Sequence, residues 1–139
     1  MEQEDYIKRQ IEQLGKVLGK LLADLIRLKT SGRMSDGIEE ADQALKTELD
    51  LDITSLTLIP AEAFLSSLLA VRKFNDKHFE QLADILFLIA EELYTSHSDS
   101  LRMKKLYERS LIIYEVLDKT SSTYSFERHM KIEKIKKVL

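Results

Sequence analysis

Tyrosine and arginine side chains recur at helical spacing in the second half of the chain, and they are the residues best suited to binding a partner. Tyr107 and Tyr114 lie seven residues apart, with Arg109 between them, and Tyr94 precedes a turn that could bring it close. Such side chains supply much of the binding energy at protein interfaces. The sequence therefore predicts that Tyr94, Tyr107, Arg109 and Tyr114 line a peptide-binding groove. Burial in a helical core is the alternative for the tyrosine stripe.

Motifs typical of catalysis, metal binding or phosphate binding do not occur in the sequence. There is no cysteine, and the three histidines are scattered, without an HExxH pattern. No GxxxxGK[ST], GxGxxG or GxSxG run is present. Residues 50–61 begin like a calcium loop, but Ser55 and Ala61 replace its glycine and glutamate. We therefore predict a non-enzymatic protein with no cofactor and no metal. The alternative is an enzyme whose carboxylates come together only on folding.

Charge is distributed unevenly along the chain, whose net charge is −3. Residues 35–52 carry seven acids against one lysine, whereas residues 100–139 carry ten lysines or arginines against five acids. A basic C-terminal helix could contact phosphates, which makes nucleic-acid or regulatory binding an alternative function. The acidic overall balance argues against it. We expect these cations to be solvated or paired internally, in particular with the acid-rich second helix of the same or a neighbouring chain.

Hydrophobic periodicity predicts an all-α fold, a bundle of about six helices in a single domain over residues 1–139. Ser35, Asn75 and Ser125 are suited to cap helix starts, and Gly32 to end the first helix in a left-handed conformation. Residues 51–59 form a connector or a short helical turn. We expect helices over about 4–30, 35–50, 60–71, 75–94, 101–117 and 126–138, with 75–94 as the central one.

The first helix carries an unbroken apolar stripe in which isoleucine or leucine recurs at alternating spacings of four and three from residue 7 to residue 28. As a coiled-coil seam, the stripe would join two copies of the chain through Ile11, Leu14, Leu18, Leu21 and Leu25. Further apolar residues widen the stripe beyond a seam, which favours burial inside the bundle over a contact between two copies. Gly15 and Gly19 indicate that another helix approaches closely, in the same chain or in a second copy.

Two stretches, IKRQIEQLGKVLGKLLADL near the start and YERSLIIYEVLDKTSSTYSFERHMKIEKIKKVL at the end, resemble a family of small, uncharacterised, all-helical bacterial proteins. Residues 82–111 also resemble one tetratricopeptide (TPR) unit, whose second helix the run Tyr107 to Leu111 matches. Met103 departs from that pattern, and no second copy follows at the family's period. The resemblance implies a TPR-like C-terminal helical hairpin, protein binding and a bacterial source.

These observations together predict a helical interaction module that binds an unidentified protein or peptide partner and self-associates as a homodimer. The first residues include acids and no apolar core behind a basic segment, which argues against a secretory signal peptide. The most apolar windows are interrupted by charges and are too short to span a bilayer. We therefore expect a cytoplasmic protein with no membrane contact.

Overall fold

The computed structural model describes residues 2–71 and 74–139, which form seven α-helices and no strand. This confirms the predicted all-α bundle. The seventh helix is the short one at residues 53–58, where the sequence left a choice between a connector and a helical turn. The elements are α1 (Glu2–Thr30), α2 (Met34–Leu49), α3 (Ile53–Leu58), α4 (Ala61–Val71), α5 (Asp76–Thr95), α6 (Ser100–Thr120) and α7 (Phe126–Val138).

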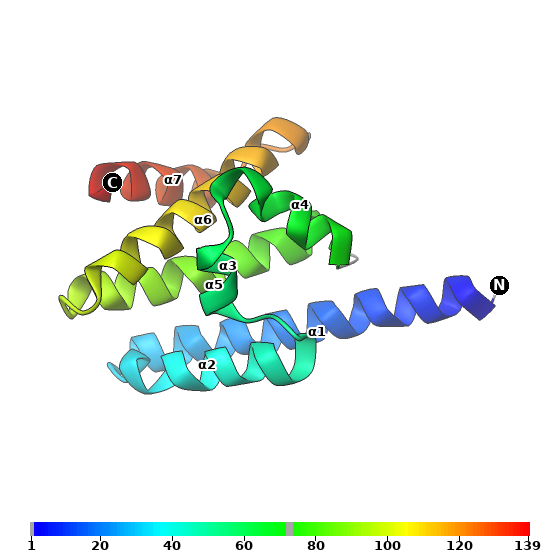
Figure 1. The fold of residues 1–139 in the computed structure, drawn as a ribbon, viewed down its shortest axis with the longest axis horizontal. Helices are drawn as coiled ribbons and strands as arrows, with labels where there is room; N and C mark the ends of the chain where they lie inside the picture. The colour runs from blue at the N-terminus through cyan, green and yellow to red at the C-terminus, as the bar shows by residue number, and fades with distance from the viewer. Residues whose placement is uncertain (1, 72–73) are drawn as a thin grey trace.

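α5 is the central helix, as the sequence predicts. α1 and α2 pack along one side of it, and α6 packs along the other side (Figure 1). Every residue from Ile85 to Glu91 is buried, so this stretch is covered all round, which is typical of a core helix. α5 and α6 form an antiparallel hairpin in which the Ser110 hydroxyl donates to the carbonyl of Ala83 at 3.2 Å.

The leucine stripe of α1 is part of this core. Leu14, Leu18, Leu21 and Leu25 are all buried within a single chain, in one cluster with the apolar residues of α2 and α5. The prediction that these four leucines join two copies of the chain is therefore wrong, and the alternative of burial in the bundle is correct. Ile11, the remaining residue of the predicted seam, is half-buried.

The two glycines in α1 explain how closely α5 approaches. A methyl group on Gly15 would lie 3.2 Å from Nε2 of His78, and one on Gly19 would lie 3.2 Å from Nε2 of Gln81. Larger residues at these positions would push α5 away, because contacts this short are tighter than ordinary packing. The close neighbour that the glycines indicate therefore belongs to the same chain.

The first three turns of α1 extend beyond the rest of the molecule (Figure 1). α1 has 29 residues and its antiparallel partner α2 has 16, so at 1.5 Å per residue about 20 Å of α1 has no α2 beside it. We call residues 2–12 the N-terminal arm. Tyr6 in this arm is 60% exposed.

Three of the four predicted helix ends are correct. Gly32 has a φ of +75°, and the side chains of Asn75 and Ser125 accept hydrogen bonds from the first turns of α5 and α7. The predicted Ser35 cap is wrong: α2 begins at Met34, and no side chain caps it. The amide of Arg33 instead donates to the carbonyl of Leu28 at 2.7 Å, so the tight turn leads directly into α2. No helix within the described residues is long and apolar enough to cross a membrane.

Candidate functional site

The predicted tyrosine groove does not exist in the folded chain. Tyr107 and Tyr114 have no exposed surface and belong to the hydrophobic core. The ring of Tyr107 packs edge-on against Phe87 of α5, with centroids 5.8 Å apart. The hydroxyl of Tyr114 donates to Oδ1 of Asp84 at 2.5 Å. The prediction that these tyrosines contact a partner is therefore wrong, and the alternative of core burial is correct.

Arg109 is also buried, and it holds α3 against α6. Its guanidinium donates to the carbonyls of Leu56 (3.3 Å), Thr57 (3.3 Å) and Ile59 (2.5 Å) at the C-terminal end of α3. It also lies 5.5 Å from the centre of the Phe64 ring. The predicted partner-binding role for Arg109 is therefore wrong. A planar group with five donors suits this task, because it satisfies several carbonyls at once.

Tyr94 is the one predicted partner-binding residue that reaches the surface. It lies in the last turn of α5 and is 50% exposed. Tyr107 and Tyr114 lie in the core and Arg109 lies against α3, so Tyr94 is not part of a shared surface with them. A single exposed aromatic side chain is ordinary for a folded protein.

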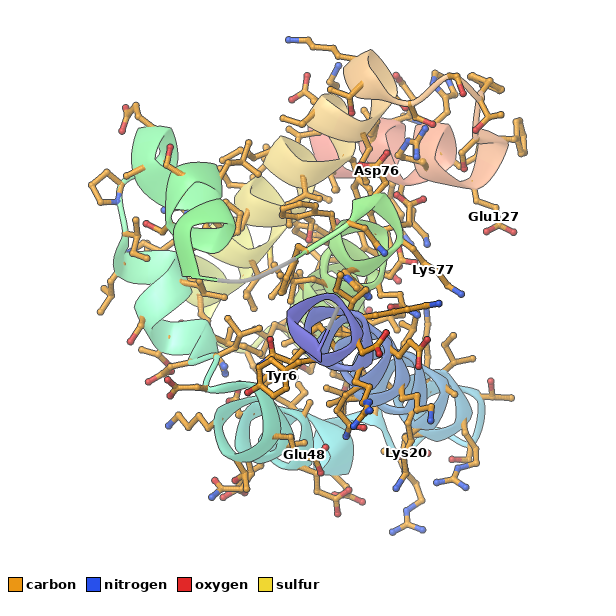
Figure 2. All side chains as sticks on the ribbon, turned by 90° about the vertical axis from the view of Figure 1, so that its right-hand side faces the viewer. Tyr6, Lys20, Glu48, Asp76, Lys77 and Glu127 are labelled. Carbon is orange, nitrogen blue, oxygen red and sulfur yellow. The ribbon has the colours of Figure 1, made fainter. Side chains whose placement is uncertain are left out.

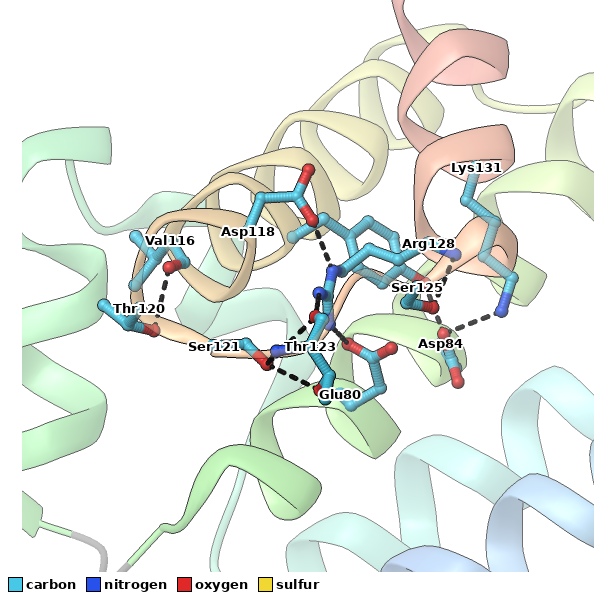
Figure 3. Close-up of polar contacts among 11 residues, drawn as sticks. Glu80, Asp84, Val116, Asp118, Thr120, Ser121, Thr123, Ser125, Arg128 and Lys131 are labelled. Atoms are coloured by element: carbon cyan, nitrogen blue, oxygen red, sulfur yellow. Dashed lines mark hydrogen bonds and ion pairs between the residues drawn. The ribbon is translucent and has the colours of Figure 1, made fainter.

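The acidic and basic side chains that the structure does bring together lie between α5 and α7. We call this set the charged layer: Glu80, Asp84 and Glu91 of α5, and Arg128, Lys131 and Lys134 of α7. The two helices run in the same direction, so each acid meets the cation at its own level. Figure 3 shows the pairs that Glu80 and Asp84 form with Arg128 and Lys131.

Arg128 is the most buried cation of the charged layer, with 7% of its side chain exposed. Its Nε donates to Oδ1 of Asp118 at 2.6 Å, and its Nη1 donates to Oε2 of Glu80 at 3.3 Å (Figure 3). The Nζ of Lys131 donates to Oδ1 of Asp84 at 2.9 Å. The guanidinium therefore joins α5, α6 and α7 at one point.

Glu91 receives cations from two directions, namely Lys134 of α7 and Lys29 of α1, the latter at 2.9 Å. The Nζ atoms of Lys131 and Lys134 also lie 5.8 Å from the centre of the Phe87 ring. Cations over an aromatic face are attracted to it. The lysines of the charged layer therefore also contact an aromatic ring of the core.

The pKa values within the charged layer are shifted in opposite directions. Burial and the neighbouring Asp84 raise the pKa of Glu80, although Arg128 opposes the shift. Burial also acts on Glu91, but hydrogen bonds from Lys134 and Lys29 outweigh it and lower the pKa of that carboxyl group. Burial, followed by the charge of Asp84, raises the pKa of Tyr114. Tyr114 therefore remains a hydrogen-bond donor to Asp84 near neutral pH.

These ion pairs occupy three of the five lysines and arginines of α7 that could have formed a phosphate-binding patch. Arg128, Lys131 and Lys134 are paired with α5, so the expected internal pairing is correct but its partner is not the acid-rich α2. α2 pairs instead with α6, through Arg102 and Asp42 at 3.0 Å. Half of the ten cations in residues 100–139 are thus engaged in ion pairs among the described residues, and the other half are not.

The outer side of α7 carries two large apolar side chains among exposed charged residues such as Glu133 and Lys137, whereas the cations of the charged layer lie on its inner side. We call Tyr124, Phe126 and Met130 the α7 ridge; they are 74%, 66% and 54% exposed. Phe126 and Met130 are four residues apart and so lie on one side of the helix. The ring of Tyr124 lies 6.1 Å from that of His129. Large apolar side chains gathered on a surface are typical of an interaction site.

The sequence contained a signal for the ridge. Phe126 and Met130 lie four residues apart, and Ile132 and Ile135 three apart, but the two pairs fall on different sides of the helix. Ile132 and Ile135 are buried, whereas Phe126 and Met130 point to solvent.

A hollow between α2, α3 and α6 has a volume of about 390 Å³. Oδ2 of Asp42 pairs with Arg102, and Asp99 accepts a hydrogen bond from the backbone of Arg102. Oδ1 of Asp42 is buried without a hydrogen-bond partner among the described residues. His78 lies elsewhere, in the capping box of α5. Among residues 2–71 and 74–139, no group of three or more potential ligands could hold a metal ion.

The chain was compared with protein families, with curated proteins and with solved structures. No family model, no curated protein and no solved structure matches it. The resemblances to a bacterial helical family and to a tetratricopeptide unit therefore stay predictions.

Proposed function

We propose that this protein is an interaction module that inserts its C-terminal helix into an apolar groove on a partner protein. The observation that carries the proposal is the α7 ridge, in which Phe126 and Met130 in the first turns of α7, and Tyr124 just before the helix, each expose a large apolar side chain. An exposed helix that presents residues at a spacing of four is the ligand half of helix-in-groove recognition.

The charged layer supports this role because it fixes α7 in place before any partner arrives. Arg128, Lys131 and Lys134 hold the inner side of the helix on α5 and α6. A helix that is already ordered loses less conformational entropy on binding than a flexible peptide does. The outer side is therefore presented as a rigid ridge.

Charge gives the proposed groove a direction. Glu127 lies at the start of α7, and Lys136 and Lys137 lie in its last turn. None of these three has an ion-pair partner among the residues that the structure describes. The partner should therefore carry basic residues beside the start of α7 and acidic residues beside its end.

The test compares the ridge with an exposed residue elsewhere. A photo-crosslinking amino acid is placed at Met130 and, as the matched control, at Tyr94, and the proteins captured in cells of the source organism are identified. The partner captured at Met130 alone is then purified. Its affinity for the protein should fall about tenfold or more in the double variant Phe126→Ser, Met130→Ser, but not in Tyr94→Ser.

Two outcomes would contradict the proposal. The same proteins could be captured at both positions, or the partner could bind the double variant as tightly as the unaltered protein. Capture that disappears after nuclease treatment would favour nucleic-acid binding instead. Circular dichroism of the double variant checks that α7 remains folded.

A further inference from the structure

The N-terminal arm and a hollow further along α1 share one side of the helix. Tyr6, Gln13, Val17 and Lys20 are separated by seven, four and three residues, which places them on the same face. This face is not the one that packs on α5, because the buried leucines lie on a different side. Figure 2 views α1 from its N-terminal end, with Tyr6 in front and Lys20 and Glu48 behind it.

The hollow lies between α1 and α2 and has a volume of about 250 Å³. Val17 and Leu21 of α1 and Ala44 of α2 supply its apolar lining, and Lys16, Lys20 and Glu48 are among its charged residues. It begins where the N-terminal arm ends, since Gln13 also lines it. An apolar floor with charged edges suits an amphipathic side chain such as tyrosine.

We propose that two copies of this chain associate through an antiparallel pairing of their α1 helices, in which Tyr6 of each copy enters the hollow between α1 and α2 of the other. A two-fold axis generates both contacts, because the arm and the hollow are present on every copy. This interface differs from the leucine seam that the sequence predicts, because Leu14, Leu18 and Leu25 are buried within the chain and Leu21 alone of the seam residues lines the hollow.

Charge complementarity supports a particular register. When two antiparallel α1 helices are aligned with Tyr6 opposite Val17, Asp5 falls opposite residue 18, between the levels of Lys16 and Lys20. Arg9 falls opposite residue 14, at the end of the hollow that Gln13 and Glu48 line.

The charges that this register brings together are unused within one chain. Asp5, Arg9, Lys16, Lys20 and Glu48 have no ion-pair partner among the residues that the structure describes. In the antiparallel dimer each would meet an opposite charge.

A parallel pairing would not do the same. Two parallel arms would place Asp5 of one copy beside Asp5 of the other, which is repulsive. The antiparallel arrangement instead places Asp5 of each copy beside the lysines of the other. The second copy thus supplies a hollow that buries the exposed ring of Tyr6, and a tyrosine ring that fills the hollow.

The test measures the mass of the purified protein by sedimentation equilibrium across a concentration series from the low micromolar to the millimolar range. We expect a monomer–dimer equilibrium that added salt shifts toward the monomer. Tyr6→Ser should weaken the dimer about tenfold or more, as the loss of an interface anchor does. Asp5→Lys and the double variant Lys16→Glu, Lys20→Glu should each weaken it as well.

Combining Asp5→Lys with Lys16→Glu and Lys20→Glu restores opposite charges and should restore dimerisation. Glu115→Lys is the matched control, because Glu115 is exposed on α6 and its change should leave the dimer intact. All of the altered residues are exposed, so each variant should retain the circular dichroism of the unaltered protein. A monomer at every concentration, a dimer that survives Tyr6→Ser, or a charge swap that fails to restore association would each overturn the proposal.

Discussion

α5 presents an apolar side to α1 and a charged side to α7, and the two interfaces are held together by different forces. On the first side, Leu14, Leu18 and Leu25 are buried in the core cluster, and Gly15 and Gly19 allow close approach. On the second side, three carboxylates meet three cations. Apolar burial stabilises in proportion to the area removed from water, whereas a buried charge is stabilising only while its partner remains.

The largest effect is expected on the apolar side. Leu18 has no exposed surface, so Leu18→Ala leaves a cavity and should lower the free energy of unfolding by about 2–5 kcal/mol. Urea denaturation measures this change. Ile26→Ala is the matched control on α1, because Ile26 is 50% exposed and its change should have little effect. A Leu18→Ala variant of undiminished stability would contradict the assignment of the stripe to the core.

A smaller effect is expected on the charged side. Arg128→Ala removes the cation that Glu80 and Asp118 share, and should lower the free energy of unfolding by about 1–3 kcal/mol. The effect falls short of a fully buried pair, since the two carboxylates are 31% and 39% exposed. Lys137→Ala on the outer side of α7 is the control.

A second change tests whether the cost comes from the carboxylate left behind. In the Arg128→Ala background, Glu80→Gln removes one unpaired charge and should recover part of the lost stability. A double-mutant cycle in urea measures the coupling. Simple additivity of the two changes would show that the charged layer does not act as a unit.

The two buried tyrosines allow the effect of a paired hydroxyl group to be compared with that of an unpaired one. Tyr114 donates to Asp84, so Tyr114→Phe should lower the free energy of unfolding by about 1–2 kcal/mol. The hydroxyl of Tyr107 is buried without a hydrogen-bond partner among the described residues. Tyr107→Phe should therefore be neutral or stabilising. Thermal unfolding of both variants measures the difference, and equal losses would contradict it.

The apolar side of α5 could be predicted because it leaves a periodic trace in the sequence. The leucines of α1 recur at spacings of four and three, and Asn75 marks the start of α5. The charged side leaves no such trace. Glu80, Asp84 and Glu91 look like ordinary surface charges, and their burial depends on where α7 lies, which no local pattern determines.

The candidate site was harder to predict for the same reason. Tyr107 and Tyr114 have the spacing of either a groove or a core stripe, and only the position of α5 decides that they are core. On α7 the sequence places apolar residues on two sides, and the cations of the inner side decide which pair faces outward. In both cases the packing of neighbouring helices decides which side chains are exposed, and this packing cannot be read from the spacing within one helix.

The smallest effects concern pH, and they compare two carboxyl groups within the charged layer. The pKa of Glu91 is lowered in the folded state, where hydrogen bonds from Lys134 and Lys29 outweigh the effect of burial. The unfolded chain then binds more protons, so the stability due to Glu91 is present above the ordinary pKa of 4.5 and is lost as the pH falls through the folded value. Glu91→Gln should therefore reduce the loss of stability in acid.

Glu80 should behave in the opposite way. Burial and Asp84 raise its pKa, so its ionisation costs stability as the pH rises from the ordinary value through the folded one. Glu80→Gln removes that cost, and the remaining rise of stability with pH should become steeper. Urea midpoints of the two variants between pH 3 and pH 7 measure both slopes. The dependence of stability on pH should change in opposite directions in the two variants. A change in the same direction would contradict a raised pKa for Glu80, due mainly to burial, and a lowered pKa for Glu91, due to its hydrogen bonds with lysines.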